Sequence, residues 1–207
     1  VCEFLGVEPK GKKIITCHIG NGASIAAVDG GKCVDTSMGL TPLEGVMMGT
    51  RSGDIDGGAV AFLQKKLNLD ADGISDLLNK KSGVLGITEL SSDMREVEAA
   101  CEKGEPKAVL AMKMYNYRIK KYIGAYAAAM GGVDIIVFTA GVGENQWSTR
   151  QESCEGLEFL GVEIDKELNK GLRGVEKVIS TANSKVTVCI IPTDEELMIA
   201  TDTMNLL

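Results

Sequence analysis

One arginine, Arg51, stands in the glycine-rich stretch DTSMGLTPLEGVMMGTRSGDID at 35–56, where threonine, serine and glycine surround it. These neighbours offer hydrogen-bond donors without bulky side chains, a setting that suits a phosphoryl group in transfer. A guanidinium there can neutralise the charge that builds up in the transition state. Asp54 and Asp56 could orient the arginine or carry metal-bound water. The structural alternative is a loop in which Arg51 and Asp54 simply form an ion pair.

Two further glycine-rich segments follow predicted strands. HIGNGAS at 18–24 leaves backbone N–H groups uncovered at Gly20 and Gly22, and such a hairpin can wrap a phosphate. AGVGEN at 140–145 stands between a buried strand and a helix, where a nucleotide can lie against the helix N-terminus. A plain hairpin turn and tight helix–strand packing are the respective structural alternatives.

Acidic residues open the last predicted helix, in IPTDEEL at 191–197. Thr193 and Glu196 have the spacing of a capping box, which gives Glu196 a structural role. Glu195 has no such role and could hold Mg²⁺ through water, because this ion keeps most of its hydration shell and takes few protein ligands. The alternative is a solvated acid that the helix dipole favours.

Composition excludes several classes of function. The chain has 207 residues, 44% of them apolar and 25% charged, which is typical of a globular cytosolic protein. Its net charge of −7 provides no basic field for nucleic acid or an anionic membrane, and no apolar run approaches membrane-spanning length. The six cysteines are scattered without a CxxC pair, so we expect buried free thiols. A cytoplasmic protein without nucleic-acid or membrane partners is the resulting expectation.

The elements that must position these residues follow from hydrophobic periodicity. Strands are predicted at 12–19, 23–29, 31–37, 133–140 and 185–192, and helices at 58–68, 74–81, 91–103, 106–130 and from about Gln146. Ser92 or Asp93 is a plausible N-cap for the third of these helices. The opening VCEFLGVEP reads like the end of a helix whose earlier part is absent. An antiparallel start followed by alternating elements indicates an α/β fold, a mixed sheet with helices on its faces.

Five motifs in this order, HIGNGAS, DTSMGLTPLEGVMMGTRSGDID, SSDMR, FTAGVGEN and IPTDEELMIA, closely resemble the C-terminal half of the acetate kinase family. The resemblance runs from about residue 12 to the end. It implies an actin-like, ribonuclease H-like ATPase lobe, with residues 1–207 as the nucleotide-binding, dimer-forming lobe of a two-lobe kinase. It also implies the reversible reaction ATP + acetate to ADP + acetyl phosphate for the full-length chain, as a phosphotransferase.

The resemblance also implies roles for individual residues. It assigns contacts with the ATP phosphates to His18, Ile19, Gly20, Asn21 and Gly22, and contacts with the nucleoside to Asp93, Met94, Arg95, Gly141, Val142, Gly143, Glu144 and Asn145. Glu195 would hold Mg²⁺, with Mn²⁺ as an alternative ion, and Arg51 would stabilise the transition state. Where the family usually reads GDIDP, this chain has GDIDG, with a freer helix start at Gly57.

Three alternatives remain open at this point. The same motifs serve propionate kinase and other short-chain acyl kinases. A non-catalytic nucleotide-binding module has no need of the arginine in GTRSGDID, and a purely structural α/β domain leaves the glycine-rich strand ends unexplained. The resemblance implies that the family's first lobe, which supplies a further acidic metal ligand, an arginine and a histidine, is absent from this chain. The chain alone is therefore expected to bind nucleotide weakly and to catalyse nothing, and to form a homodimer.

Overall fold

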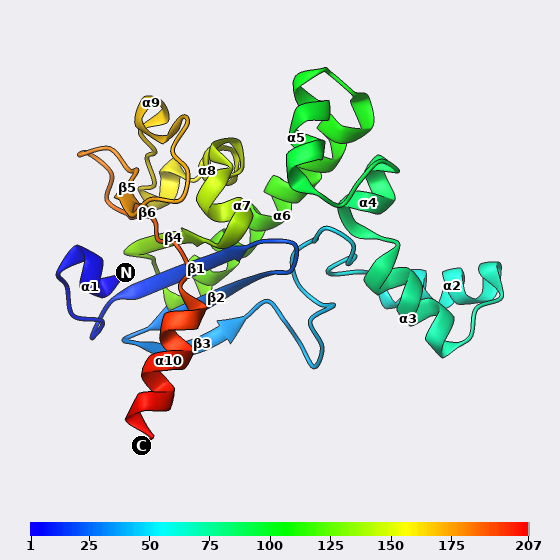
Figure 1. Ribbon diagram of the computed structural model, residues 1–207, viewed down its shortest axis with the longest axis horizontal. Helices are drawn as coiled ribbons and strands as arrows, with labels where there is room; N and C mark the ends of the chain where they lie inside the picture. The colour runs from blue at the N-terminus through cyan, green and yellow to red at the C-terminus, as the bar shows by residue number, and fades with distance from the viewer. Residues whose placement is uncertain (207) are drawn as a thin grey trace.

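One mixed sheet organises the molecule, as the computed structural model shows for residues 1–206 (Figure 1). In this part of the chain six strands lie in the order β3-β2-β1-β4-β6-β5. Their bounds are β1 Lys13–Ile19, β2 Ala23–Asp29, β3 Lys32–Thr36, β4 Ile135–Thr139, β5 Lys177–Val178 and β6 Thr187–Ile190. The first three strands form an antiparallel meander, whereas β1, β4 and β6 run parallel and β5 returns antiparallel to β6. The predicted mixed α/β sheet is confirmed.

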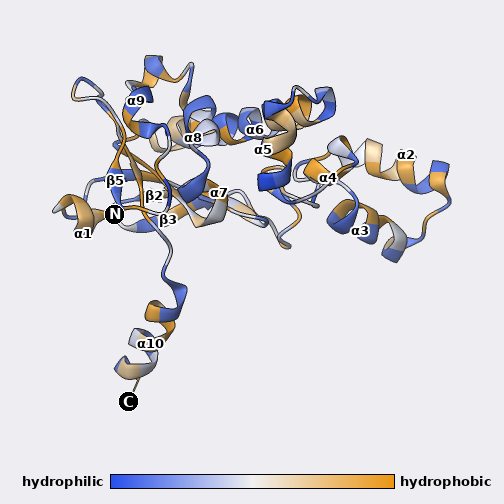
Figure 2. Ribbon diagram, turned by 45° about the horizontal axis from the view of Figure 1, so that its top comes forward, coloured by the Kyte–Doolittle hydropathy of each residue, from blue (hydrophilic) through white to orange (hydrophobic). Residues whose placement is uncertain are grey.

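Helices fill the connections between the strands. Their bounds are α1 Cys2–Leu5, α2 Gly57–Leu67, α3 Ala71–Lys80, α4 Gly83–Thr88, α5 Met94–Glu102, α6 Pro106–Met130, α7 Ala140–Asn145, α8 Trp147–Cys154, α9 Lys166–Asn169 and α10 Glu195–Asn205, with a 3₁₀ turn at Glu158–Leu160. Helix α6 crosses behind β1 and β2 (Figure 1). Figure 2 shows α2 and α3 far from the sheet at one end, and α10 projecting away from the sheet.

The central strands are buried on both faces. Ile15 and Phe138 face the layer formed by α6, while Ile14 and Val137 face a smaller apolar cluster that includes Leu5 of α1. Neighbouring residues of a strand point to opposite faces, so a strand covered on both sides reads as a continuous apolar run. That is why VDIIVFTA could be identified as a central strand from its sequence.

Capping residues and other local sequence signals predicted the ends of several helices. Helix α6 spans the predicted 106–130, with Pro106 in its first turn and Gly131 ending it at a left-handed φ of 69°. Asp93 is the N-cap of α5, since its side chain accepts a hydrogen bond from the Arg95 N–H. Helix α3 begins earlier than predicted because Asp70 caps it.

Other predictions need correction. Residues 140–145, predicted as a turn, form helix α7, and α8 then begins at Trp147. The short elements α4, α9 and β5 were not predicted. The six cysteines are unpaired within residues 1–206, as expected, but Cys33 is exposed rather than buried. Across the same residues, no helix combines the length and apolar character needed to span a membrane.

Candidate functional site

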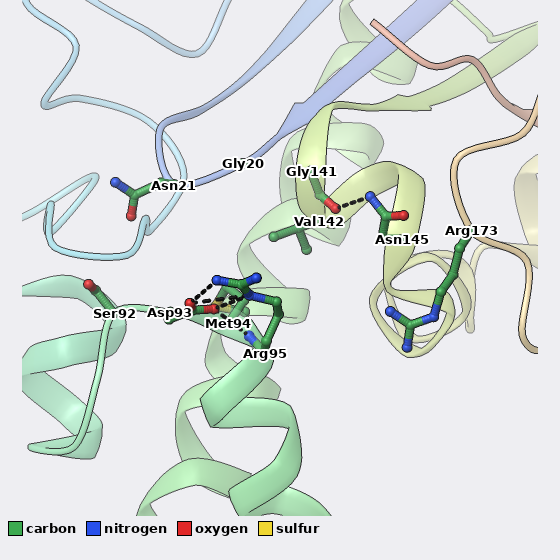
Figure 3. A pocket seen from close by; sticks show the side chains of 10 residues that line it. All are labelled: Gly20, Asn21, Ser92, Asp93, Met94, Arg95, Gly141, Val142, Asn145 and Arg173. Atoms are coloured by element: carbon green, nitrogen blue, oxygen red, sulfur yellow. Dashed lines mark hydrogen bonds and ion pairs between the residues drawn. The ribbon is translucent and has the colours of Figure 1, made fainter.

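A cavity of about 710 Å³ lies at the edge of the sheet where the parallel strands end (Figure 3). This size is usual for small-molecule sites. Four separate segments line it: the turn after β1, the start of α5, helix α7 and the loop before β5. Its lining residues are Gly20, Asn21, Ser92, Asp93, Met94, Arg95, Gly141, Val142, Asn145 and Arg173.

The parallel register explains why distant loops meet here. Strands β1, β4 and β6 run in one direction, so the segments that follow them leave the same edge of the sheet. A Cβ placed on Gly20 would lie 3.7 Å from the Cβ of Ala140. After β6, Thr193 donates from its backbone N and from its hydroxyl to Glu144 Oε1, at 2.9 and 3.0 Å. The edge is therefore one connected surface.

The turn after β1 packs against the arginine-containing stretch. Gly20 N donates to Gly22 O at 3.1 Å, which closes the turn, and Gly49 N donates to Asn21 O at 3.3 Å. A Cβ on Gly22 would lie only 3.3 Å from Arg51 Nη1. A side chain at this position would therefore crowd the guanidinium, and glycine leaves space beside it.

His18 and Ile19 are the last two residues of β1, as the predicted strand at 12–19 placed them. Both belong to β1, where His18 pairs with Thr139 of β4. The Ile19 side chain is fully buried in the core, so its backbone is what could face a ligand. Gly20, Asn21 and Gly22 form the turn itself.

Arg51 has no carboxylate partner within ion-pair distance in the part of the chain that the structure describes. Its Nη1 lies 3.6 Å from the Met48 sulfur. The alternative of an Arg51–Asp54 pair is therefore wrong. Asp54 instead accepts hydrogen bonds from Arg118 Nη2 at 2.7 Å and from the Tyr122 hydroxyl at 2.9 Å, both on α6.

Asp56 does not orient the arginine either. Its carboxylate accepts from Gly58 N at 2.9 Å and caps α2. Arg51 lines a second hollow of about 640 Å³, whose opposite wall is formed by residues of α3. Asp72 and Asp76 line the same hollow, but neither forms an ion pair with the guanidinium, which lies beside the glycine turn.

The start of α5 presents an ion pair at the mouth of the first cavity (Figure 3). Arg95 donates to the Asp93 carboxylate through Nε at 3.0 Å and through Nη2 at 2.6 Å. These hydrogen bonds, together with one from the Arg95 backbone, lower the pKa of Asp93 to about 2. The pair holds the planar guanidinium in a fixed orientation at the rim, where it could stack on a flat ring.

Helix α7 forms the opposite wall of the cavity. It enters from β4 through Ala140, whose φ of 64° is left-handed and uncommon for a residue with a Cβ. Strained backbone of this kind concentrates at functional sites. Asn145 donates to Gly141 O at 2.9 Å within the helix, and Val142 and Gly143 are buried.

The sequence analysis did not identify Arg150 or Arg173 as residues of the site. Arg150 is fully buried and donates to Gly143 O and Glu144 O, both at 2.9 Å, so it holds the C-terminal turn of α7 in place. Burial lowers its pKa to about 10, and the neighbouring Arg173 acts in the same direction. The segment WSTRQESC carries no apolar periodicity, so no local signal marks this arginine as a core residue.

Glu195 lies on the first turn of α10 and is exposed. The predicted capping box is wrong: Asp194, rather than Thr193, caps the helix by accepting from Leu197 N at 3.0 Å. Among residues 1–206, no three His, Cys, Asp or Glu side chains converge on a metal-sized site. A single carboxylate nevertheless suits an ion such as Mg²⁺, which takes few protein ligands and fills its remaining positions with water and phosphate oxygens.

The mixed sheet, with a ligand-sized cavity at the ends of its parallel strands, belongs to an actin-like ATPase fold, as its structural matches show and as the resemblance implied. The crystal structure of Porphyromonas gingivalis acetate kinase matches 99% of this chain and 51% of that chain, with a TM-score of 0.97 and 60% identity. A propionate kinase from Francisella tularensis subsp. tularensis SCHU S4 matches 100% of this chain and 52% of that one, with a TM-score of 0.91 and 41% identity.

The sequence model of the Acetokinase family matches residues 1–201, and the chain belongs to this family. Acetate kinase from Phocaeicola vulgatus is 72% identical over 207 residues, which is 100% of this chain and 52% of the relative. The chain thus spans about half the length of the curated relatives it matches.

Proposed function

We propose that this chain is the nucleotide-binding lobe of an acetate kinase, a phosphotransferase that interconverts ATP and acetate with ADP and acetyl phosphate. One observation carries the proposal: the glycine turn after β1 lines a nucleotide-sized cavity and also lies beside Arg51, an arginine without an ion-pair partner in the described residues. The 72% identity with the Phocaeicola vulgatus acetate kinase supports it. An acetate oxygen would attack the γ-phosphorus of ATP, and ADP would leave from the opposite side.

Each segment of the site has a role in this proposal. The turn at Gly20, Asn21 and Gly22, with the neighbouring ends of β1, would hold the ATP phosphates through backbone N–H groups. The α5 start at 93–95 and helix α7, including 141–145, would face the nucleoside across the cavity. Arg51 would neutralise the charge that develops on the transferring phosphoryl group.

Glu195 would hold the Mg²⁺ ion that accompanies the nucleotide, and Mn²⁺ would bind in the same way. When bound, this ion supplies charge neutralisation at the phosphates. Thr193, tied to Glu144, fixes the backbone just before α10 and so limits where the Glu195 carboxylate can reach.

Propionate is the second candidate substrate, because the propionate kinase structure matches the whole chain with a TM-score of 0.91. Comparing acetate with propionate at equal concentration in the assay described below separates the two substrates.

We also propose a homodimer formed through this part of the protein, acting in the cytoplasm. Leu110, Met114 and Tyr117 lie on one exposed stripe of α6, with 52%, 42% and 58% of their surfaces exposed. Other residues of α6, among them Tyr115 and Ile119, are buried in the core. A two-fold contact would cover the exposed stripe. Sedimentation showing a monomer at high micromolar concentration would contradict the dimer.

A chimera tests the activity. The 207 residues of this chain would replace the matching part of the Phocaeicola vulgatus acetate kinase, and acetyl phosphate formation would be measured. We expect turnover close to that of the parent enzyme, and a folded chimera without turnover would refute the proposal.

The isolated chain provides the second arm of the test. It should bind Mg·ADP weakly by calorimetry and produce no acetyl phosphate, because phosphoryl transfer depends on a closed, dry site with fixed charges on both sides. Turnover by the isolated chain near that of a kinase would show that this division of roles is wrong.

A further inference from the structure

The backbone around Arg51 is held by residues 78–85, which run from the last turn of α3 to the first turn of α4 and form the α3–α4 turn. Ser82 N donates to Thr50 O at 3.0 Å, Val84 N to Met48 O at 3.0 Å and Leu85 N to Gly49 O at 2.9 Å. In the opposite direction, Ser52 N donates to Leu78 O at 3.0 Å. Consecutive residues on both sides of the arginine are therefore bonded to this one turn.

Two further bonds shape the same loop. The Thr50 hydroxyl donates to Asn79 O at 2.8 Å, and Met48 N donates to Arg51 O at 3.1 Å. So many hydrogen bonds fix the backbone of this loop in one conformation. The direction of the Arg51 side chain therefore depends on the position of the α3–α4 turn.

Gly83 stands at the centre of this contact. It is buried, and its φ of 60° is left-handed. A Cβ at this position would overlap Met48 O and would lie 2.7 Å from Arg51 O and 3.1 Å from Arg51 N. All three atoms are backbone, so no side-chain rotation can relieve the clash, and the loop itself would have to move.

We propose that Gly83 is a positioning residue for the reaction: its missing side chain lets the Arg51 backbone seat against the α3–α4 turn and so sets the place of the guanidinium. The inference rests on the proposed role of Arg51 in phosphoryl transfer. Gly83 itself does not line the nucleotide cavity, and the atoms nearest to its missing Cβ belong to Met48 and Arg51 of the arginine loop.

The decisive variant is Gly83→Ala in the active chimera. A displacement of the guanidinium by about 1 Å can cost on the order of a hundredfold in rate, so we expect kcat to fall about ten- to a hundredfold. KM for ATP should change less than about twofold, because α5 and α7 carry the nucleoside contacts and a contact made only in the transition state affects kcat.

Gly104→Ala is the matched control. Gly104 also has a left-handed φ, 78°, but a Cβ there would meet no atom within 4 Å. This variant carries the same type of backbone strain without the clash, and it should keep kcat near that of the unmodified chimera. Equal kcat losses in the two variants would overturn the proposal.

A double-mutant cycle separates positioning from general destabilisation. If Gly83 acts through the arginine, Gly83→Ala should cost less than about twofold in kcat when Arg51→Ala is already present. A loss that multiplies fully with that of Arg51→Ala would overturn the proposal.

Thr50→Val covers the case in which Gly83→Ala fails to fold. It removes the Thr50–Asn79 hydrogen bond with almost no change in shape, and should lower kcat severalfold, again without a further loss in Arg51→Ala. An unchanged kcat in Thr50→Val would contradict the inference. An unmodified chimera without turnover would instead refute the proposed function, so the two failures are distinguishable.

Discussion

Arg150→Met tests the idea that a buried arginine holds helix α7 and with it one wall of the cavity. The guanidinium donates to Asn169 Oδ1 at 2.8 Å, to Gly143 O and Glu144 O at 2.9 Å and to Leu172 O at 3.0 Å. Methionine has a similar length but donates nothing, so three of these acceptors would lose their partner, and Glu144 O would keep only the Gly174 N–H at 3.3 Å.

The expected cost follows from these contacts. A buried acceptor without a partner costs about 1–3 kcal/mol, and the low end applies here because water can enter part of the vacated space. Three acceptors without a donor and the weakened contact of Glu144 O then give about 3–4 kcal/mol. Removing the desolvated charge, whose burial lowers the pKa of Arg150 to about 10, returns part of this. We expect a net loss of about 3 kcal/mol in the free energy of unfolding, which is roughly 6–12 °C in Tm for a chain of this size.

Urea unfolding and thermal melting of the variant provide the measurement, with Arg95→Met as the control. The Arg95 side chain is 88% exposed and pairs with Asp93 at the surface, so its loss should leave Tm almost unchanged. In the chimera, Arg150→Met should also raise KM for ATP, because the α7 carbonyls would shift. A Tm within about 2 °C of the unmodified chain would refute this account of Arg150.

Three further predictions follow from the site and its surroundings. Arg51→Ala in the chimera should lower kcat by about a hundredfold, on the order of 3 kcal/mol, with KM for ATP little changed; a mutant altered only in KM would show a ground-state binder. The pKa of Asp76 is lowered to about 2 by hydrogen bonds from Lys81 and Lys80. The stabilisation from this depressed pKa is present above the unfolded value of about 4 and is lost as pH falls through about 2, so Lys81→Ala should raise the Asp76 pKa in an NMR titration. Glu144→Ala should raise severalfold the Mg²⁺ concentration that gives half-maximal rate, because it releases the backbone before α10; an unchanged Mg²⁺ dependence would argue against that link.

The sequence alone determined the elements whose stability is local. Helix α6 could be bounded at 106–130 because its apolar spacing, its proline and its terminal glycine all act within a few residues of one another. The strand at 133–140 was equally clear, since burial on both faces selects a continuous apolar run. The family resemblance, carried by ordered motifs, predicted the fold and three of the four segments that line the cavity, but not the loop that carries Arg173.

Choices among competing partners were decided by the tertiary structure. Asp54 could have paired with Arg51, three residues away, but α6 brings Arg118 and Tyr122 to it from far along the chain. Thr193 could have capped α10, yet Glu144 takes its hydrogen-bonding groups and Asp194 becomes the cap.

The roles of Arg150 and Gly83 could not be predicted from the sequence either. Arg150 lies in a polar segment, and only the packing of α8 against α9 and α7 makes it a core residue. Gly83 contacts the Arg51 loop although the two lie some thirty residues apart in sequence. No local sequence pattern could predict that a side chain at position 83 would clash with that loop. Short-range propensities act through neighbours in sequence, whereas the partner of a polar group and the room beside a backbone depend on which distant segments the folded sheet and helices bring together.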